Sequence, residues 1–150
     1  MLKQQLKDEL KQSMLARNAV KTSVLRMVIS AMSYYEIQKG GANYEASDED
    51  VLAVIQKEAK QHRDSIEQFK SGGREELVAK EEEELKILET YLPEQMGEEE
   101  IRRLVAEAVA QTGASVAADM GKVMGALMPK TKGKADGSLV SKIVREQLAN

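Results

Sequence analysis

Lysines occupy every second position in one short segment, at Lys130, Lys132 and Lys134. Residues 121–145 carry six cations and a single anion, Asp136, although the whole chain has a net charge of −3 at pH 7. Ammonium groups with few matching carboxylates favour binding of a polyanion, because contacts with phosphates release condensed counterions. The candidate nucleic-acid contacts are therefore these six cations: Lys122, Lys130, Lys132, Lys134, Lys142 and Arg145.

Glycines accompany these cations. Gly121 and Gly125 lie four apart in a short expected helix, where each costs about 1 kcal/mol relative to alanine. One interpretation is close packing of this helix against another. The second is close approach of a phosphate or a partner helix to the bare backbone, helped by the free amides at the start of the next helix. The candidate positions for backbone approach are Gly121, Gly125, Gly133 and Gly137.

The expected ligand of this segment is a structured RNA such as tRNA. No aromatic residue follows Tyr91, so stacking on unpaired bases is not expected there. Contact would run through the phosphate backbone and the shape of the RNA. A loop of solvated lysines without a ligand is the alternative interpretation.

Other chemically capable residues favour structural roles. His62 is the only histidine and has no second ligand at helical spacing, so we expect a partly packed boundary residue. Glu81–Glu84 predict a solvated acidic face, because consecutive helical residues point around the axis. Met120, Met124 and Met128, spaced by four, predict core packing. We expect no catalytic residue, no metal site and no cofactor.

The elements that position these residues are predicted to be helices alone. Apolar residues make up 42% of the 150-residue chain, with few aromatics, two prolines and no cysteine. Apolar stripes at helical spacing predict seven helices and no strand, an all-α fold. Expected starts are Asn18, Ser47 with Asp50, Asp119 and Asp136, and Pro129 is expected to end the sixth helix.

A boundary is predicted near Pro93, where helical periodicity is lost. Residues 1–92 would form an N-terminal domain of about four helices, and residues 93–150 a C-terminal three-helix domain. The N-terminus lacks the apolar core of a signal peptide, and no run approaches the length of a membrane span. With no cysteine, these features lead us to expect a cytoplasmic protein with no membrane partner.

Several separate motifs resemble one family across essentially the whole chain. They are residues 58–65 (EAKQHRDS), 91–95 (YLPEQ), 121–130 (GKVMGALMPK) and 133–137 (GKADG). These motifs are closely similar to the YqeY family, which shares its helical region with the C-terminal part of the B subunit of glutamine-dependent tRNA amidotransferase. The sequence departs from the family where His62 replaces an expected basic residue and Gly97 an expected serine cap.

The resemblance implies an N-terminal helical domain followed by a smaller three-helix domain, with tRNA as partner. Amidotransferase subunits or other translation proteins are further candidate partners. The chain shows neither an amidase serine–lysine centre nor a metal-and-ATP site, so the leading hypothesis is a non-catalytic RNA-binding module. A protein-interaction adapter is the second hypothesis. The third, carried by the family name alone, is an accessory factor in carbon–nitrogen ligase activity on aminoacyl-tRNA with glutamine as amido-N-donor.

Overall fold

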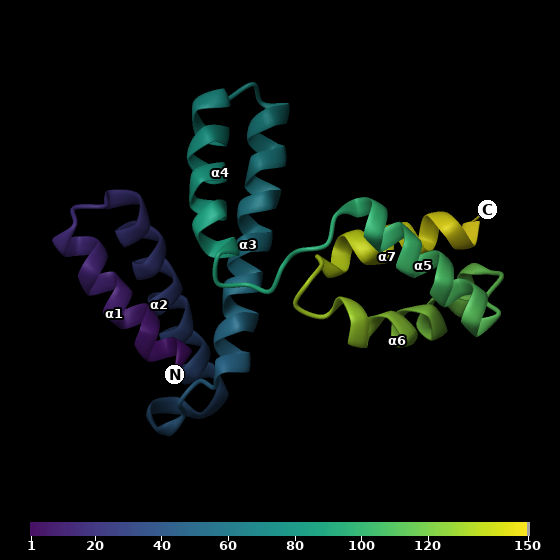
Figure 1. The fold of residues 1–150 in the computed structure, drawn as a ribbon, viewed down its shortest axis with the longest axis horizontal. Coiled ribbons are helices and arrows are strands. Elements are labelled where there is room, and N and C mark those ends of the chain that lie inside the picture. Colours follow the sequence, from purple (N-terminus) through teal and green to yellow (C-terminus); the bar gives the residue numbers. More distant parts are fainter. Residues whose placement is uncertain (150) are drawn as a thin grey trace. The chain divides into compact units, whose positions relative to one another are not determined.

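The computed structural model describes residues 1–149, which form seven α-helices and two short 3-10 turns without a β-strand (Figure 1). The predicted all-α fold is confirmed. In chain order the elements are α1 (Leu2–Leu15), α2 (Ala19–Gly40), η1 (Gly41–Asn43), α3 (Asp48–Ser71), α4 (Glu75–Glu89), α5 (Glu98–Thr112), η2 (Ala117–Asp119), α6 (Met120–Thr131) and α7 (Gly137–Ala149).

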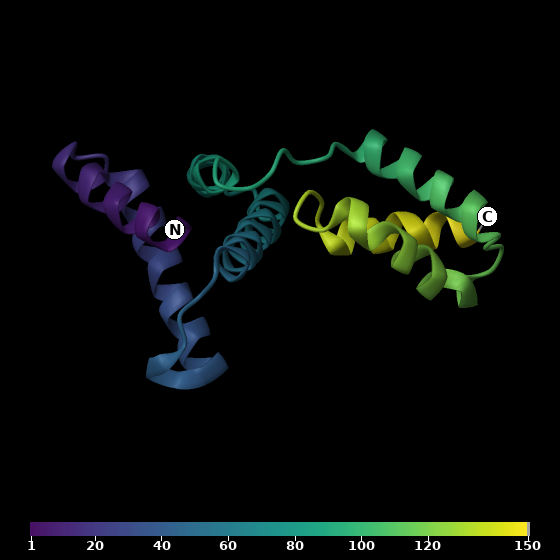
Figure 2. The same cartoon turned by 60° about the horizontal axis from the view of Figure 1, so that its bottom comes forward.

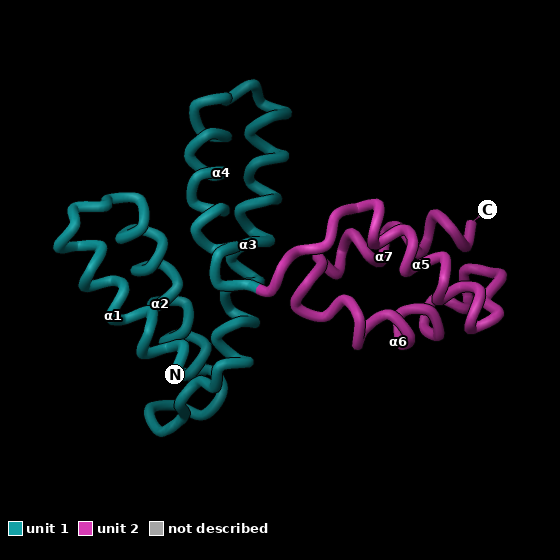
Figure 3. The backbone as a smooth tube through the Cα atoms, viewed as in Figure 1, with its two compact units in different colours: residues 1–92 teal, residues 93–150 magenta. Residues whose placement is uncertain are grey.

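The chain divides into two compact units, Met1–Leu92 and Pro93–Asn150 (Figure 3). Each has its own cluster of buried apolar side chains, so each supplies its own hydrophobic stabilisation. The first cluster draws on α1, α2, α3 and α4, and the second on α5, α6 and α7.

The first unit is built from two helical hairpins, α1 with α2 and α3 with α4 (Figures 1 and 2). α2 packs against α1, α3 and α4, and its buried residues are Val24, Leu25, Val28 and Met32. This position explains the wide apolar surface in its sequence, since a helix with neighbours on several sides needs more than one stripe.

Two predicted helix starts in this unit are confirmed. The side chain of Asn18 accepts a hydrogen bond from the amide of Lys21 at 3.1 Å. Ser47 and Asp50 form a reciprocal capping box, in which each side chain accepts from the other residue's backbone amide. Both caps satisfy amides that the first helical turn leaves without partners.

The second unit packs α5, α6 and α7 against one another. Its fully buried members include Ile101, Val105, Val123, Ile143 and Val144. The short loop between α6 and α7 contributes Ala135 to the same core. The segment with the candidate lysines is thus built around this second core.

Two predicted details of α6 are wrong. The helix continues through Pro129 to Thr131: Pro129 has no N–H to donate, but it lies in the last turn, and the amide of Lys132 still reaches the carbonyl of Met128 at 3.0 Å. The Asp119 carboxylate does not cap α6. It accepts from the amides of Ser115 and Val116, and so caps the preceding turn η2.

None of the helices within residues 1–149 is both long and apolar enough to cross a membrane.

Candidate nucleic-acid interface

The six candidate cations come from three consecutive pieces of the second unit. Lys122 and Lys130 belong to α6, Lys132 and Lys134 to the loop after it, and Lys142 and Arg145 to α7. All six are exposed. The buried residues of these helices are Val123 and Leu127 in α6 and Ile143 and Val144 in α7. Lys130 follows Val123 by seven residues, so it lies in the last turn on the same side of α6 as the core residues.

Helical geometry sets how these cations are spread. Lys122 precedes Lys130 by eight residues, which is about 12 Å along the axis of α6. Lys142 and Arg145 lie three apart in α7 and are neighbours on its surface. The charges are therefore spread over two helices and a loop rather than converging on one point, which suits a chain of phosphates better than a single anion.

The six cations also differ from the other cations of their unit in their partners. Arg102 pairs with Glu98 and Glu146, and Arg103 pairs with Glu100 and Glu107. Within residues 1–149, no carboxylate lies within ion-pair distance of Lys122, Lys130, Lys132, Lys134, Lys142 or Arg145. Their charge is available to a ligand without breaking an internal ion pair.

The backbone of the lysine loop is anchored. The amide of Met96 donates to the carbonyl of Lys134 at 2.8 Å, and the side-chain amide of Gln95 donates to the carbonyl of Gly133 at 3.1 Å. The amide of Lys134 donates back to the carbonyl of Thr131 at 2.9 Å. Gly133 has φ +78°, a left-handed conformation that favours glycine. The lysine side chains therefore extend from a backbone with fixed hydrogen bonds.

The candidate glycines have free space where a side chain would lie. A Cβ added at Gly121, Gly125, Gly133 or Gly137 would meet nothing within 4 Å. The close-packing interpretation of Gly121 and Gly125 is therefore wrong within this chain, and the interpretation of backbone approach stays a prediction.

The three methionines of α6 differ in how far they are buried. Met120 and Met124 pack partly buried against the core, as predicted, whereas Met128 is 51% exposed. The core-packing prediction is thus wrong for Met128. The exposed residues of α6 are Gly121, Lys122, Gly125, Met128, Pro129 and Lys130.

The free amides at the start of α7 are less available to a phosphate than we expected. The amide of Ser138 donates to Oδ1 of Asp136 at 3.0 Å, so the chain's own carboxylate occupies one of the free amides. This confirms Asp136 as the start of α7. It also leaves the lysines, rather than the helix amides, as the main positive groups available to a phosphate.

Two glutamates of the acidic run are not solvated as predicted. Oε2 of Glu84 lies 3.0 Å and Oε2 of Glu81 3.6 Å from Nε2 of His62, which is itself buried. Their spacing of three places both carboxylates on the face of α4 that meets α3. Glu82 and Glu83 between them are exposed, as expected.

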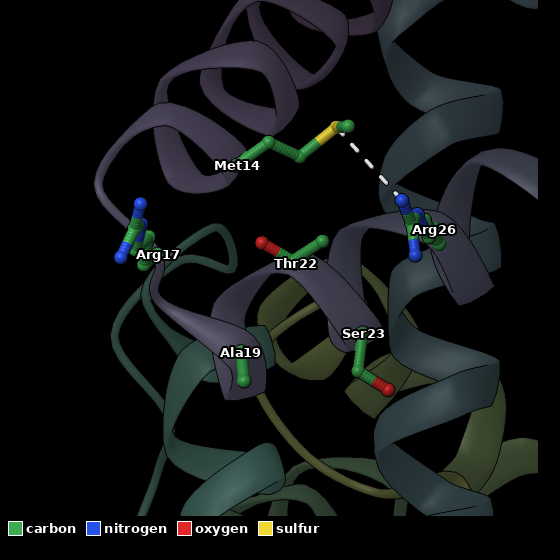
Figure 4. Close-up of a pocket in the computed structure, with 6 residues that line it drawn as sticks. All are labelled: Met14, Arg17, Ala19, Thr22, Ser23 and Arg26. Atoms are coloured by element: carbon green, nitrogen blue, oxygen red, sulfur yellow. Dashed lines mark hydrogen bonds between the residues drawn. The ribbon is translucent and has the colours of Figure 1, made fainter.

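The sequence reasoning missed two further cations in the first unit. Arg17 and Arg26 lie on opposite sides of a hollow of about 550 Å³, lined also by Met14, Ala19, Thr22 and Ser23 (Figure 4). None of these lining residues is acidic. Arg17 has φ +56°, and Met14, although it continues the four-residue spacing of Leu2, Leu6 and Leu10, is 49% exposed. The interruption between the stripe ending at Met14 and the Asn18 cap was the available signal.

Fold and surface together define the class: an all-α protein of two helical units, the second with six exposed cations that have no ion pair within residues 1–149. The family model described as "Yqey-like protein" matches residues 3–148. The chain belongs to this family, whose domain is a helical domain like the C-terminal region of the B subunit of tRNA amidotransferase.

The curated relatives carry one shared name, "Altered inheritance of mitochondria protein 41, mitochondrial". The protein from Vanderwaltozyma polyspora is 34% identical over 87 residues, which cover 58% of this chain and 46% of the relative. That from Pyrenophora tritici-repentis is 39% identical over 105 residues, covering 67% and 56%. A Saccharomyces cerevisiae protein is 33% identical over 87 residues, covering 58% and 46%.

The chain thus spans about half the length of the curated relatives that it matches. Their shared name contradicts the cytoplasmic location that we expected from the sequence, because these relatives are named as mitochondrial proteins.

Proposed function

We propose that this protein binds structured RNA, with tRNA as the leading candidate, and catalyses no reaction by itself. The phosphate contacts would be made by Lys122, Lys130, Lys132, Lys134, Lys142 and Arg145. The observation that carries the proposal is the contrast inside the second unit: these six cations are exposed and have no ion pair with any residue that the structure describes, whereas Arg102 and Arg103 are paired.

Unpaired cations can contact a phosphate at a lower cost in free energy than paired ones. A cation already bound to a carboxylate must lose that partner to contact a phosphate, whereas an unpaired lysine gives up only water and counterions. The six cations are distributed over α6, the loop and α7, and no aromatic residue is available in these segments to stack on a base. These features support recognition of backbone and shape in a folded RNA.

The experiment measures tRNA affinity as a function of salt concentration. The slope of log K against log salt is expected to be about −0.7 to −0.9 per phosphate contacted. Replacing Lys130, Lys132 and Lys134 together by alanine should reduce the magnitude of this slope by about 2 to 3 if all three make contacts.

A matched control removes the same charge elsewhere. Lys57, Lys80 and Lys86 are exposed lysines of the first unit, without an ion pair among the described residues. Their combined replacement by alanine should leave the slope nearly unchanged. Equal losses in both triple variants would mean that net charge alone governs binding, and an unchanged slope in the loop variant would remove the loop from the proposal.

The exposed face of α6 supports a second candidate function, as a protein-interaction surface. Met128 is 51% exposed beside Gly121 and Gly125, whose backbone a partner helix could approach closely. Capture of partners should then survive nuclease treatment and be lost in Met128→Glu. Met128→Leu is the matched control, since it keeps an apolar side chain of similar volume. Amidotransferase subunits are included as candidate partners in the same experiment, and recovery of RNA alone would count against this function.

A further inference from the structure

A cluster of three side chains joins the two helices of the second hairpin in the first unit. His62 comes from α3, and Glu81 and Glu84 come from α4, which lies beside it (Figures 1 and 2). Their side chains are 8%, 22% and 14% exposed, respectively. One oxygen of each carboxylate and one ring nitrogen of the histidine all lie within 4.8 Å of one another.

The hydrogen bond made by the other ring nitrogen, Nδ1, determines which nitrogen of His62 carries the hydrogen. Nδ1 of His62 lies 2.9 Å from the carbonyl oxygen of Glu58. A carbonyl oxygen can only accept, so Nδ1 carries the hydrogen and donates it. In a neutral imidazole, Nε2 then holds a lone pair, and this lone pair faces the two carboxylates. Three electron-rich atoms then meet in a largely buried place, an arrangement that a bound cation would stabilise.

The two carboxylates lie at different distances from Nε2 of His62. A hydrogen on Nε2 would serve Glu84 at 3.0 Å, but Glu81 at 3.6 Å is beyond hydrogen-bond length. A tetrahedral ion with ligands at about 2.0–2.2 Å requires ligand atoms about 3.3–3.6 Å apart. The Glu81 separation of 3.6 Å is at the upper end of this range and the Glu84 separation of 3.0 Å is below it, so small side-chain adjustments would complete the coordination.

The surroundings are those of a metal ligand set. A metal-binding histidine commonly donates its second ring N–H to a carbonyl or carboxylate, which orients the ring, as Glu58 does here. Glu81 and Glu84 are spaced by three in α4 and therefore point the same way. One imidazole with two carboxylates suits first-row divalent ions, whereas Mg²⁺ and Ca²⁺ prefer oxygen ligands alone.

We propose that His62, Glu81 and Glu84 form a binding site for one divalent transition-metal ion, with Zn²⁺ as the reference ion. Three protein ligands leave a fourth position for water. Because the ligands come from both α3 and α4, the ion joins the two helices and stabilises the folded hairpin. The site is independent of the RNA-binding surface, and its test does not depend on that function.

The test titrates the metal-free, untagged full chain with ZnCl₂ in a calorimeter. The expected result is one Zn²⁺ per chain, with a thermal midpoint that rises on saturation and does not rise with equimolar MgCl₂. Co²⁺ serves as a spectroscopic probe: its visible absorption should report nitrogen and oxygen ligands, and Zn²⁺ should displace it.

Two variants remove the site in different ways. His62→Arg removes the nitrogen ligand and keeps a cation opposite the two glutamates, so the fold is expected to persist. Glu81→Gln with Glu84→Gln removes the carboxylates. Each should weaken Zn²⁺ binding by about tenfold or more. Glu82→Gln with Glu83→Gln is the matched control, since it removes the same charge from exposed positions of the same helix, and it should bind as the unmodified chain does.

Absence of saturable Zn²⁺ binding in the unmodified chain overturns the proposal and leaves the cluster as a histidine–glutamate ion pair. Equal affinity in the control and in both site variants also overturns it, because the ion would then bind dispersed surface carboxylates. Circular dichroism of each variant establishes that lost binding is not lost folding.

Discussion

The phenol of Tyr35 in α2 donates a hydrogen bond to Oδ1 of Asp50 in the first turn of α3, at 2.7 Å. Tyr44 donates to Oδ2 of the same carboxylate at 2.8 Å, and the amide of Ser47 at 3.0 Å. The bond to Asp50 raises the pKa of Tyr35 to about 12. The bonds from Tyr35, Ser47 and Tyr44 hold the pKa of Asp50 well below its usual value. One carboxylate thus connects α2, the segment after it and the start of α3.

This carboxylate predicts a pH-dependent contribution to stability. A pKa lowered by folding means that stabilisation is present above the unfolded value of about 4 and is lost as the pH falls through the lower folded value. Asp50→Asn should lower the thermal midpoint at pH 7, and the difference from the unmodified chain should narrow below about pH 4. Glu49→Gln, an exposed neighbour, is the control. A difference that stays constant from pH 7 to pH 2 would contradict the prediction.

Gly125→Ala should stabilise α6 by about 0.5–1 kcal/mol, because alanine costs less conformational entropy than glycine. The added Cβ meets nothing within 4 Å. If RNA approaches the bare backbone, the same variant should bind tRNA more weakly while it unfolds at higher denaturant concentration. Gly40→Ala is the contrasting case, since its Cβ would lie 2.9 Å from Cβ of Tyr44, and it should destabilise. A more stable Gly125→Ala with unchanged RNA affinity would show that backbone approach is not needed.

Arg17→Gly should stabilise the turn between α1 and α2. Arg17 has φ +56°, in a left-handed cap where the amide of Asn18 donates to the carbonyl of Ser13 at 2.9 Å. Glycine relieves a conformational cost of about 1–2 kcal/mol, less its own entropy cost, so the expected net gain is about 0.5–1 kcal/mol. Urea unfolding measures the gain. Arg17→Ala keeps a side chain in the left-handed conformation and should not gain stability. An equal gain in both variants would argue against strain at this residue.

Ile143→Ala should destabilise the second unit by about 2–5 kcal/mol, since the side chain is completely buried and its removal leaves a cavity. Met128→Ala removes a side chain of similar size from the same unit at an exposed position and should cost much less. Amide hydrogen exchange in α5, α6 and α7 measures the change. Similar losses of protection in the two variants would contradict the assignment of Ile143 to the core.

The local features were readable from the sequence. Asn18 and Ser47 act within one helical turn, so their side-chain chemistry and the apolar stripes after them were sufficient to predict the starts of α2 and α3. The all-α fold followed for the same reason, because each stripe reports the face of a single helix. The turn at Gly133 is also local, because glycine readily adopts the left-handed conformation found there.

The features that depend on more than one helix could not be predicted from the sequence. The meeting of Glu81 and Glu84 with His62 is set by how α3 and α4 align along the hairpin, and neither helix contains that information by itself. Asp119 could cap the turn before it or the helix after it, and the choice depends on the preceding backbone. Arg17 lies where glycine usually does, so no residue signal marked its left-handed conformation.

The loop anchors have a mechanical consequence. Gln95 and Met96 are almost the first residues of the second unit, and their hydrogen bonds end on the backbone of Gly133 and Lys134. A force applied to the polypeptide at Pro93 is therefore transmitted directly to the turn that carries the lysines. In the same way, a ligand that immobilises this turn also immobilises the segment around Gln95 and Met96. The two segments order or loosen as one.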